Sequence, residues 1–219
     1  MRSSGLRAVL LILILPWIGS CFDYKERIVF KKAWSGYVEM SYSVPVFPAS
    51  GQSMIGFLPV RKSDVESHFS RLLFTRRVEN YRVYYLQRAS GPLPDRARVS
   101  FRIAFDGAGE LAQILPGKAS VVLRRNRLRI QRELSRGDVA LENELPLLAN
   151  YAERIHSGLE GHRLEWQITF PPEMQVETSG QLFGQQASMS LPLSATLKEG
   201  PFLGFTTELK VAASAAEVP

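Results

Sequence analysis

The chain has 219 residues, a formal net charge of +6, and 45% hydrophobic against 22% charged residues. This balance is ordinary for a folded globular protein and excludes an intrinsically disordered chain. Cys21 is the only cysteine, which excludes intrachain disulfides, so the folded part must be stable through its hydrophobic core.

The first 21 residues have the layout of a bacterial lipoprotein signal peptide. Two arginines precede the apolar run 8–15, which is too short for a membrane-spanning helix, since that needs about 20 residues. Ile18-Gly19-Ser20-Cys21 is similar to the lipobox, the motif that is cleaved before its cysteine. We therefore expect cleavage between Ser20 and Cys21 and acylation of the Cys21 thiol, including palmitate, because two or three acyl chains anchor a protein stably. An uncleaved anchor or a buried core helix is the alternative.

Removal of residues 1–20 would leave a net charge of about +4, and the expected mature protein is a single α+β domain over 21–211 with a disordered tail at 212–219. The expected location is the bacterial cell envelope, with lipid anchorage to a membrane. In a Gram-negative host, Phe22 after the cysteine favours the outer membrane, on its periplasmic or surface face. An exported protein is not expected to meet nucleic acid.

Basic residues gather in one short segment. Five of them are candidates for contact with an anionic surface: Arg124, Arg125, Arg127, Arg129 and Arg132. The alternative is the solvated face of a hairpin, because Arg127 and Arg129 alternate with Leu128 and Ile130 at the period of a strand.

Alternation of apolar and polar residues predicts strands along most of the chain. The expected strands are 27–32, 37–44, 78–88, 97–105, 119–124, 127–134, 163–170, 173–178, 186–193 and 203–211. Turns are expected at Ser35-Gly36, Asp106-Gly107 and Arg125-Asn126. Apolar spacing of three and four predicts helices at 63–75 and 145–158, and a short helical piece at 108–115. Short turns favour antiparallel pairing, so we expect an α+β fold with a mainly antiparallel curved sheet and two principal helices on one face.

Two regions of the sequence together carry a resemblance to a known family. One is the path from Cys21 through a charged strand and Ser35-Gly36 into a second strand; the other is Ile168-Thr169-Phe170-Pro171 followed by Val176-Glu177-Thr178-Ser179-Gly180. This order resembles the LppM-type bacterial lipoproteins. Pro172 replaces the glycine usual in that family, Ser179 replaces a common asparagine, and the C-terminal membrane helix of many members is not expected. The resemblance implies a curved sheet wrapped around helices that holds lipid or glycolipid.

Catalytic patterns are sparse. The histidines His68, His156 and His162 lack metal-ligand spacing, and neither a G-x-S-x-G elbow nor a dinucleotide motif is present. No metal, cofactor or enzymatic activity is therefore expected. A hydrolytic enzyme would gain support if a pocket placed His156 or His162 close to a carboxylate.

Aromatic side chains are candidates either for lining an apolar cavity or for filling the core. The cavity candidates are Trp34, Tyr84, Trp166 and Phe170. The sequence thus favours an envelope lipoprotein that binds lipid or another apolar ligand. The alternative is a structural or assembly lipoprotein that contacts an envelope protein and binds no ligand.

Overall fold

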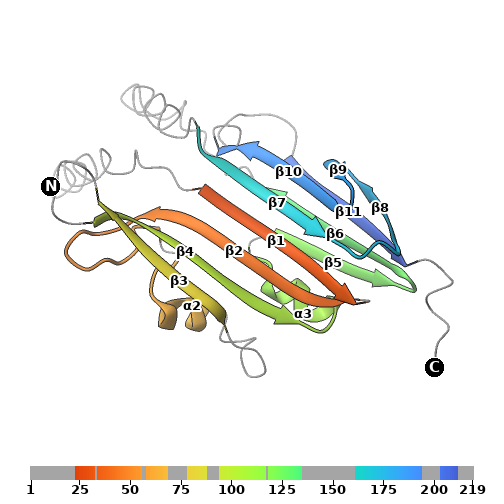
Figure 1. Ribbon diagram of the computed structural model, residues 1–219, viewed down its shortest axis with the longest axis horizontal. Helices are drawn as coiled ribbons and strands as arrows, with labels where there is room; N and C mark the ends of the chain where they lie inside the picture. The colour runs from red at the N-terminus through yellow and green to blue at the C-terminus, as the bar shows by residue number, and fades with distance from the viewer. Residues whose placement is uncertain are drawn as a thin grey trace, which may run out of the picture.

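Two open β-sheets pack against each other in the computed structural model (Figure 1). The structure describes residues 23–32, 34–55, 58–68, 78–87, 94–116, 118–134, 161–193 and 203–211. In spatial order, the seven-stranded sheet contains β3 (Glu79–Gln87), β4 (Pro94–Phe105), β2 (Ser35–Pro45), β1 (Asp23–Lys32), β7 (Arg163–Thr169), β10 (Gln186–Pro192) and β9 (Gln181–Phe183). The four-stranded sheet contains β5 (Lys118–Arg124), β6 (Arg127–Leu134), β11 (Leu203–Val211) and β8 (Met174–Thr178).

The expected fold class is confirmed, with a difference in topology. The fold is α+β and its strand pairs are mostly antiparallel, but the strands form two sheets and β1 pairs with β7 in parallel. A parallel pair cannot be closed by a short turn, and β7 indeed enters the sheet long after β1 in the chain. Strand β9 was not expected from the sequence.

The shared interior lies between the two sheets. Along β1 the side chains alternate, so that Tyr24, Ile28 and Phe30 are buried while their neighbours are more exposed. Trp166 of β7 stacks on Phe205 of β11, with ring centroids 6.1 Å apart. The apolar side chains of each alternating strand therefore face the interior between the two sheets.

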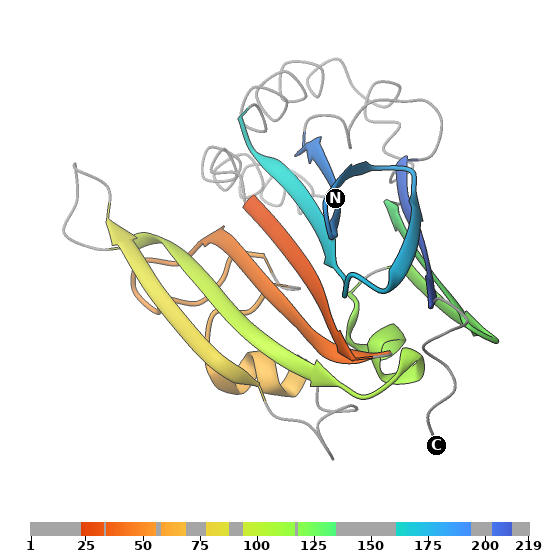
Figure 2. The same ribbon diagram turned by 45° about the vertical axis from the view of Figure 1, so that its right-hand side comes forward.

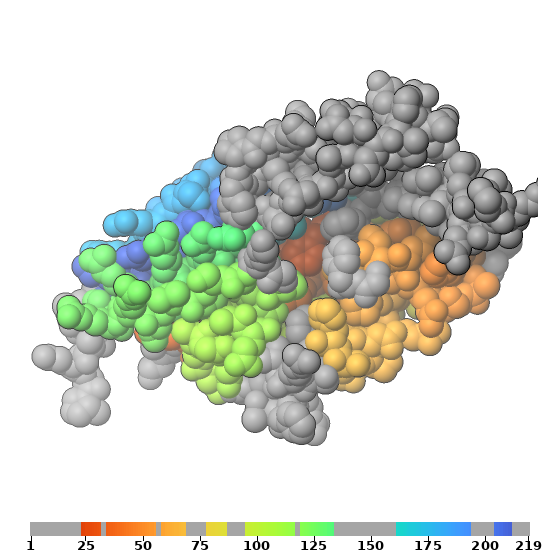
Figure 3. Space-filling model, turned by 180° about the vertical axis from the view of Figure 1, so that it is seen from behind, coloured from red at the N-terminus to blue at the C-terminus, as the bar shows by residue number. Residues whose placement is uncertain are grey.

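Two short helices lie on the inner face of the seven-stranded sheet (Figures 1 and 3). In α2 (Lys62–His68) the side chain of Val65 is buried, and in α3 (Ala108–Ile114) those of Leu111 and Ile114 are buried. Helix α3 confirms the short helical piece expected at 108–115. The expected helix at 145–158 lies outside the described residues, as do the end of the expected helix at 63–75 and the leader with Cys21. No helix in the described part is long and apolar enough to cross a membrane.

A glycine allows the chain to pass from one sheet to the other. Gly180 follows β8 of the four-stranded sheet and precedes β9 of the seven-stranded sheet. A Cβ atom on Gly180 would lie 2.3 Å from the backbone oxygen of Ser188 and 2.8 Å from the ring of Phe205. The absence of a side chain therefore lets this corner pack closely against β10 and β11.

Candidate functional site

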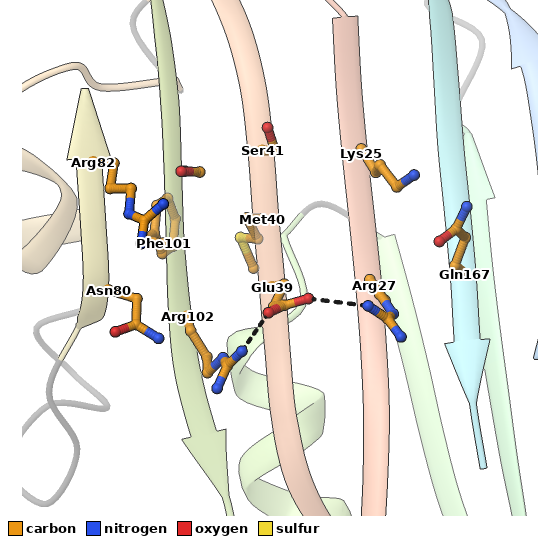
Figure 4. Close-up of a pocket in the computed structure, with 11 residues that line it drawn as sticks. Lys25, Arg27, Glu39, Met40, Ser41, Asn80, Arg82, Phe101, Arg102 and Gln167 are labelled. Carbon is orange, nitrogen blue, oxygen red and sulfur yellow. Dashed lines mark hydrogen bonds and ion pairs between the residues drawn. The ribbon is translucent and has the colours of Figure 1, made fainter. Parts of the chain in front are cut away.

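The outer face of the seven-stranded sheet carries a polar hollow of about 370 Å³ (Figure 4). Its floor includes Ser41 on β2 and Ser100 on β4, which are cross-strand neighbours. Lys25 pairs with Ser41 on one side and Arg82 pairs with Ser100 on the other. Because two small serines occupy the middle of a row whose ends are long basic side chains, the face is hollowed there.

One side of this hollow is formed by a row of charges across three strands. Glu39 on β2 accepts a hydrogen bond from Arg102 on β4 at 2.5 Å and forms an ion pair with Arg27 on β1 at 3.6 Å (Figure 4). The guanidinium of Arg102 also lies over the ring of Tyr37, 3.9 Å from its centroid. The hydrogen bond to Glu39 raises the pKa of Arg102. Arg27 and Arg102 thus share the single carboxylate of Glu39.

A second hollow of about 360 Å³ continues from the first along β2 and shares Lys25 and Ser41 with it. Ser43 contributes to it from β2, and Arg98 and Arg163 contribute from β4 and β7. We call the two hollows together the basic trough; its charged residues are Lys25, Arg27, Arg82, Arg98, Arg102 and Arg163 with Asp23, Glu39 and Glu165.

The positive charge of the basic trough exceeds its negative charge. Lys25 pairs with Glu165 at 3.2 Å, and Arg27 and Arg102 share Glu39. Arg82 and Arg98 are exposed, and no described carboxylate lies within ion-pairing distance of either. The trough can therefore accept an anionic group beside the serine hydroxyls.

The arginine-rich hairpin expected from the sequence forms around Arg125-Asn126, where Arg125 has a φ of 55°. Arg124, Arg125, Arg127 and Arg129 are exposed, but Arg132 is 5% exposed and faces the interior. The expectation that Arg132 contacts an anionic surface is corrected, because this side chain lies between the sheets. There it donates to Glu26 at 3.0 Å and to the backbone oxygen of Pro116 at 2.7 Å.

The buried pair of Arg132 and Glu26 belongs to a polar cluster that the sequence analysis missed. Tyr24 donates its hydroxyl hydrogen to Glu26 at 3.1 Å, and the Arg132 guanidinium lies 5.6 Å from the ring centroid of Trp166. Burial raises the pKa values of both Tyr24 and Glu26. A pattern was available, since Glu26 is in phase with Ile28 and Arg132 with Ile130 and Leu128.

The four aromatic residues proposed for an apolar cavity do not come together. Trp166 and Phe170 are buried, and Trp34 packs edge-on against Phe30 with centroids 6.4 Å apart. Tyr84, in contrast, is 55% exposed on β3, which is separated from β7 by three strands. The interpretation of Tyr84 as a cavity residue is corrected, because its strand position directs it to the outer face with its neighbour Arg98.

One histidine lies beside a carboxylate. Nδ1 of His162 is 3.0 Å from Oδ1 of Asp23, and Asp23 lines the second hollow. No hydroxyl of the described residues is hydrogen-bonded to His162, and these residues contain no group of three His, Cys, Asp or Glu side chains that could hold a metal ion. The pair supplies one element of an acid–base site without an adjacent nucleophile.

The profile of the LIC11874-like family matches residues 16–210. The chain belongs to the LIC11874-like family. A sequence comparison with curated proteins gave no match.

Solved structures offer distant likenesses. The folded domain of LppM from Mycobacterium tuberculosis is 12% identical, with a TM-score of 0.48, and the match covers 91% of this chain and 95% of that one. An aminopeptidase N family protein from Idiomarina loihiensis is 10% identical with a TM-score of 0.33, covering 87% of this chain and 29% of that one. An M1 zinc metallopeptidase from Deinococcus radiodurans is 11% identical with a TM-score of 0.29, covering 86% and 41%. At these identities and TM-scores the likenesses assign no activity or ligand.

Proposed function

We propose that this member of the LIC11874-like family is a lipid-anchored protein of the bacterial cell envelope, and that its domain binds the anionic head of an amphiphilic molecule in the basic trough. The lipobox at 18–21 supports the anchor. The observation that carries the ligand class is the single carboxylate of Glu39 shared by Arg27 and Arg102, beside Arg82, which has no carboxylate of the described residues within ion-pairing distance.

The chemistry of the trough favours a polar and negatively charged group over a purely apolar ligand. Charge-assisted hydrogen bonds from guanidinium groups to phosphate or carboxylate oxygens are short and roughly twice as strong as neutral ones. The hydroxyls of Ser41, Ser43 and Ser100 can donate to or accept from the hydroxyls of a headgroup. Lipid or glycolipid is therefore the ligand class we propose, and its charged head is the part that the trough contacts.

We propose binding in preference to catalysis. Hydrolysis requires a nucleophile or an activated water beside a base, and among the described residues the His162 ring is hydrogen-bonded only to Asp23, whose carboxylate accepts. A hydrolytic role would require the His162–Asp23 pair to support turnover, so His162→Gln would abolish any hydrolysis measured with the purified protein.

The anchor is tested by acyl labelling in the bacterial host. The parent chain should incorporate labelled palmitate, and Cys21→Ala should abolish the incorporation and leave the leader uncleaved. Ser20→Ala is the matched control, because it keeps a small residue before the cysteine and should remain labelled. Labelling of Cys21→Ala would contradict the proposed anchor.

The ligand class is tested with lysophosphatidylglycerol, which is anionic, against lysophosphatidylcholine, which has no net charge. The parent should prefer the anionic lipid. Ser41→Leu, which fills the trough, and Arg82→Ser should each weaken its binding by about tenfold, the equivalent of one charge-assisted contact. Ser120→Leu and Arg129→Ser are matched controls on exposed positions of the other sheet. Equal affinity for the two lipids would contradict the proposal.

An edge strand favours the second candidate, contact with an envelope protein. Strand β9 ends the seven-stranded sheet, and on it Leu182 is 49% and Phe183 is 68% exposed. Unpaired backbone groups and apolar side chains on such an edge can accept a strand of another protein. Under this candidate, Phe183→Ser would remove crosslinks from β9 to an envelope protein and would leave lipid binding unchanged.

A further inference from the structure

The first described residue of β1 fixes which end of the domain lies near the proposed anchor. Asp23 is two residues after Cys21. An extended chain covers at most about 3.6 Å per residue, so the acylated residue can lie no more than about 7 Å from Asp23. The bilayer is therefore close to the end of the seven-stranded sheet at which β1 begins.

The strand register identifies the other residues of that end. Asp23 pairs with Ser43 on β2, and Ser43 pairs in turn with Arg98 on β4. Arg98 pairs with Tyr84 on β3, so the four residues form one row across the sheet. Each strand is about 4.8 Å from the next, so Tyr84 lies about 15 Å across the sheet from Asp23 at the same height. Figure 2 shows the beginnings of β1 and β4 and the ends of β2 and β3 on one side of the molecule.

The next level of the sheet extends beyond Asp23 toward the anchor. Arg96 of β4 pairs with Leu86 of β3, and this pair lies two residues nearer the end of the sheet at which β1 begins than the pair of Arg98 and Tyr84. Two strand residues rise about 7 Å, so Leu86 lies about 7 Å beyond the level of Asp23 at this end of the sheet. Phe47 lies in the turn after β2, next to Val46, whose N–H donates to the backbone oxygen of Asp95 at the start of β4.

Several large apolar side chains are exposed at this end of the sheet. Half of the eight large hydrophobic residues that are exposed in the described part of the chain belong to it: Phe47 (51%), Tyr84 (55%), Tyr85 (46%) and Leu86 (41%). Arg98 is exposed next to Tyr84 on the neighbouring strand, and Arg163 is exposed at the same end of the sheet on β7. Aromatic and basic side chains together are typical of surfaces at the headgroup level of a bilayer, where the rings are amphipathic and the charges meet anionic lipid.

We propose that this end of the sheet, which we call the anchor-end rim (Phe47, Tyr84, Leu86, Arg98 and Arg163), lies on the surface of an anionic bilayer and orients the domain. The proposal rests on the proposed acylation of Cys21. It places the second hollow of the basic trough, which contains Arg98 and Arg163, next to the lipid headgroups. The arginine hairpin between β5 and β6 lies at the opposite end in both ribbon views and faces away from that membrane (Figures 1 and 2).

The single cysteine gives a direct experiment. In the acylated full-length mature protein Cys21 is blocked, so a cysteine introduced at one position is the only thiol open to a fluorescent label. Tyr84→Cys and Phe47→Cys place the label on the anchor-end rim. Leu123→Cys is the matched control, because Leu123 is 41% exposed on β5. Each labelled protein is reconstituted into vesicles of phosphatidylethanolamine and phosphatidylglycerol that contain a lipid with a nitroxide quencher near its headgroup.

We expect several-fold stronger quenching at positions 84 and 47 than at position 123, and a smaller difference when Arg98 and Arg163 are both replaced by glutamate. Equal quenching at the three positions, or stronger quenching at 123, would contradict membrane contact by the anchor-end rim. It would not contradict the proposed acylation of Cys21. Labelling of the parent protein by the thiol reagent would show a free Cys21 and would overturn the anchor itself, and the rim with it.

Discussion

Arg132 on β6 donates a hydrogen bond to Glu26 on β1 at 3.0 Å, and this ion pair joins the two sheets in the interior. The side chains are 6% and 1% exposed. Removing two charges from water is costly, and their mutual attraction offsets the cost only while both partners are present. The pair is therefore a strong constraint on how the sheets sit, even if its net contribution to stability is small.

Arg132→Leu should lower the free energy of unfolding by about 3 to 5 kcal/mol at neutral pH, because it leaves the Glu26 carboxylate buried without its partner. Urea denaturation measures the change. Arg129→Leu, on an exposed position of the same strand, is the control and should change stability by less than about 0.5 kcal/mol. The double replacement Glu26→Leu with Arg132→Leu should recover most of the loss, since no charge remains buried. A double variant no more stable than Arg132→Leu would contradict this account.

The effect of Arg132→Leu should depend on pH. Burial raises the pKa of Glu26 above 4.5, and Arg132 opposes this rise. The folded protein therefore keeps a proton on Glu26 at pH values where the unfolded chain has lost it, and stability falls as pH rises from 4.5 to the folded-state pKa. Without Arg132 that range widens upward, so the variant should lose more stability with rising pH than the parent does. Unfolding curves at acidic and neutral pH check this; a loss of the same size at both would contradict it.

Glu39→Gln should strengthen binding of lysophosphatidylglycerol by several-fold, because Arg27 and Arg102 no longer share a carboxylate and the basic trough becomes more positive. Stability should change by less than about 1 kcal/mol, since the ion pairs are partly exposed. Titration at low and high salt measures both the gain and its screening. Glu177→Gln, at an exposed position of the other sheet, should leave the affinity unchanged; a gain of the same size there would show a general effect of net charge.

Gly36→Ala should destabilise the protein by about 2 kcal/mol or more, because the new Cβ would lie 1.9 Å from the backbone oxygen of Val29 and the hairpin of β1 and β2 would have to shift. Thermal or urea unfolding gives the value. Gly109→Ala in α3 is the matched control, since nothing lies within 4 Å of its added Cβ, and it should gain up to about 1 kcal/mol of helix propensity. Similar losses at the two glycines would contradict the steric explanation.

Arg125→Asn should stabilise the β5–β6 hairpin by about 0.5 to 1 kcal/mol, because Arg125 has a φ of 55° and asparagine adopts this left-handed conformation at lower cost. The same substitution should leave vesicle association of the acylated protein unchanged, since the hairpin lies away from the anchor. Flotation with anionic vesicles measures the second effect, with Arg98→Asn as the comparison that should weaken association.

Local pattern was sufficient to predict most strands. The alternation in 97–105 and 163–170 predicted β4 and β7 closely, and the Arg125-Asn126 turn was confirmed. The turn predicted at Ser35-Gly36 was wrong in position, because both residues lie in β2 and pair with Lys32 and Phe30 of β1. The same alternation, applied to charged residues, would have shown that Arg132 is in phase with Ile130 and that Glu26 is in phase with Ile28. The burial of Arg132 and Glu26 was missed because a charged side chain is usually exposed. Their positions in the alternation of each strand predict the opposite, since they fall on the side that faces the interior.

The basic trough could not be predicted from the sequence. Its residues come from β1, β2, β3, β4 and β7, and the row Arg27–Glu39–Arg102 exists only because the β1–β2 hairpin pairs in one register with β4, which is distant in sequence. The exposure of Tyr84 likewise depends on which strands pair with β3, which the sequence of β3 does not show. A single strand shows which residues share a face, but not which strand lies beside it.

The sequence by itself determined the alternating faces of the strands, the class of fold and the basis for expecting a lipidated Cys21, because these depend on short-range spacing and on a contiguous motif. Only the tertiary structure decided that there are two sheets, that Arg132 is buried against Glu26, and that the arginine hairpin lies at the opposite end from the start of β1. Those features depend on long-range strand pairing, in which the burial of apolar faces selects one partner and register among many that the local pattern allows.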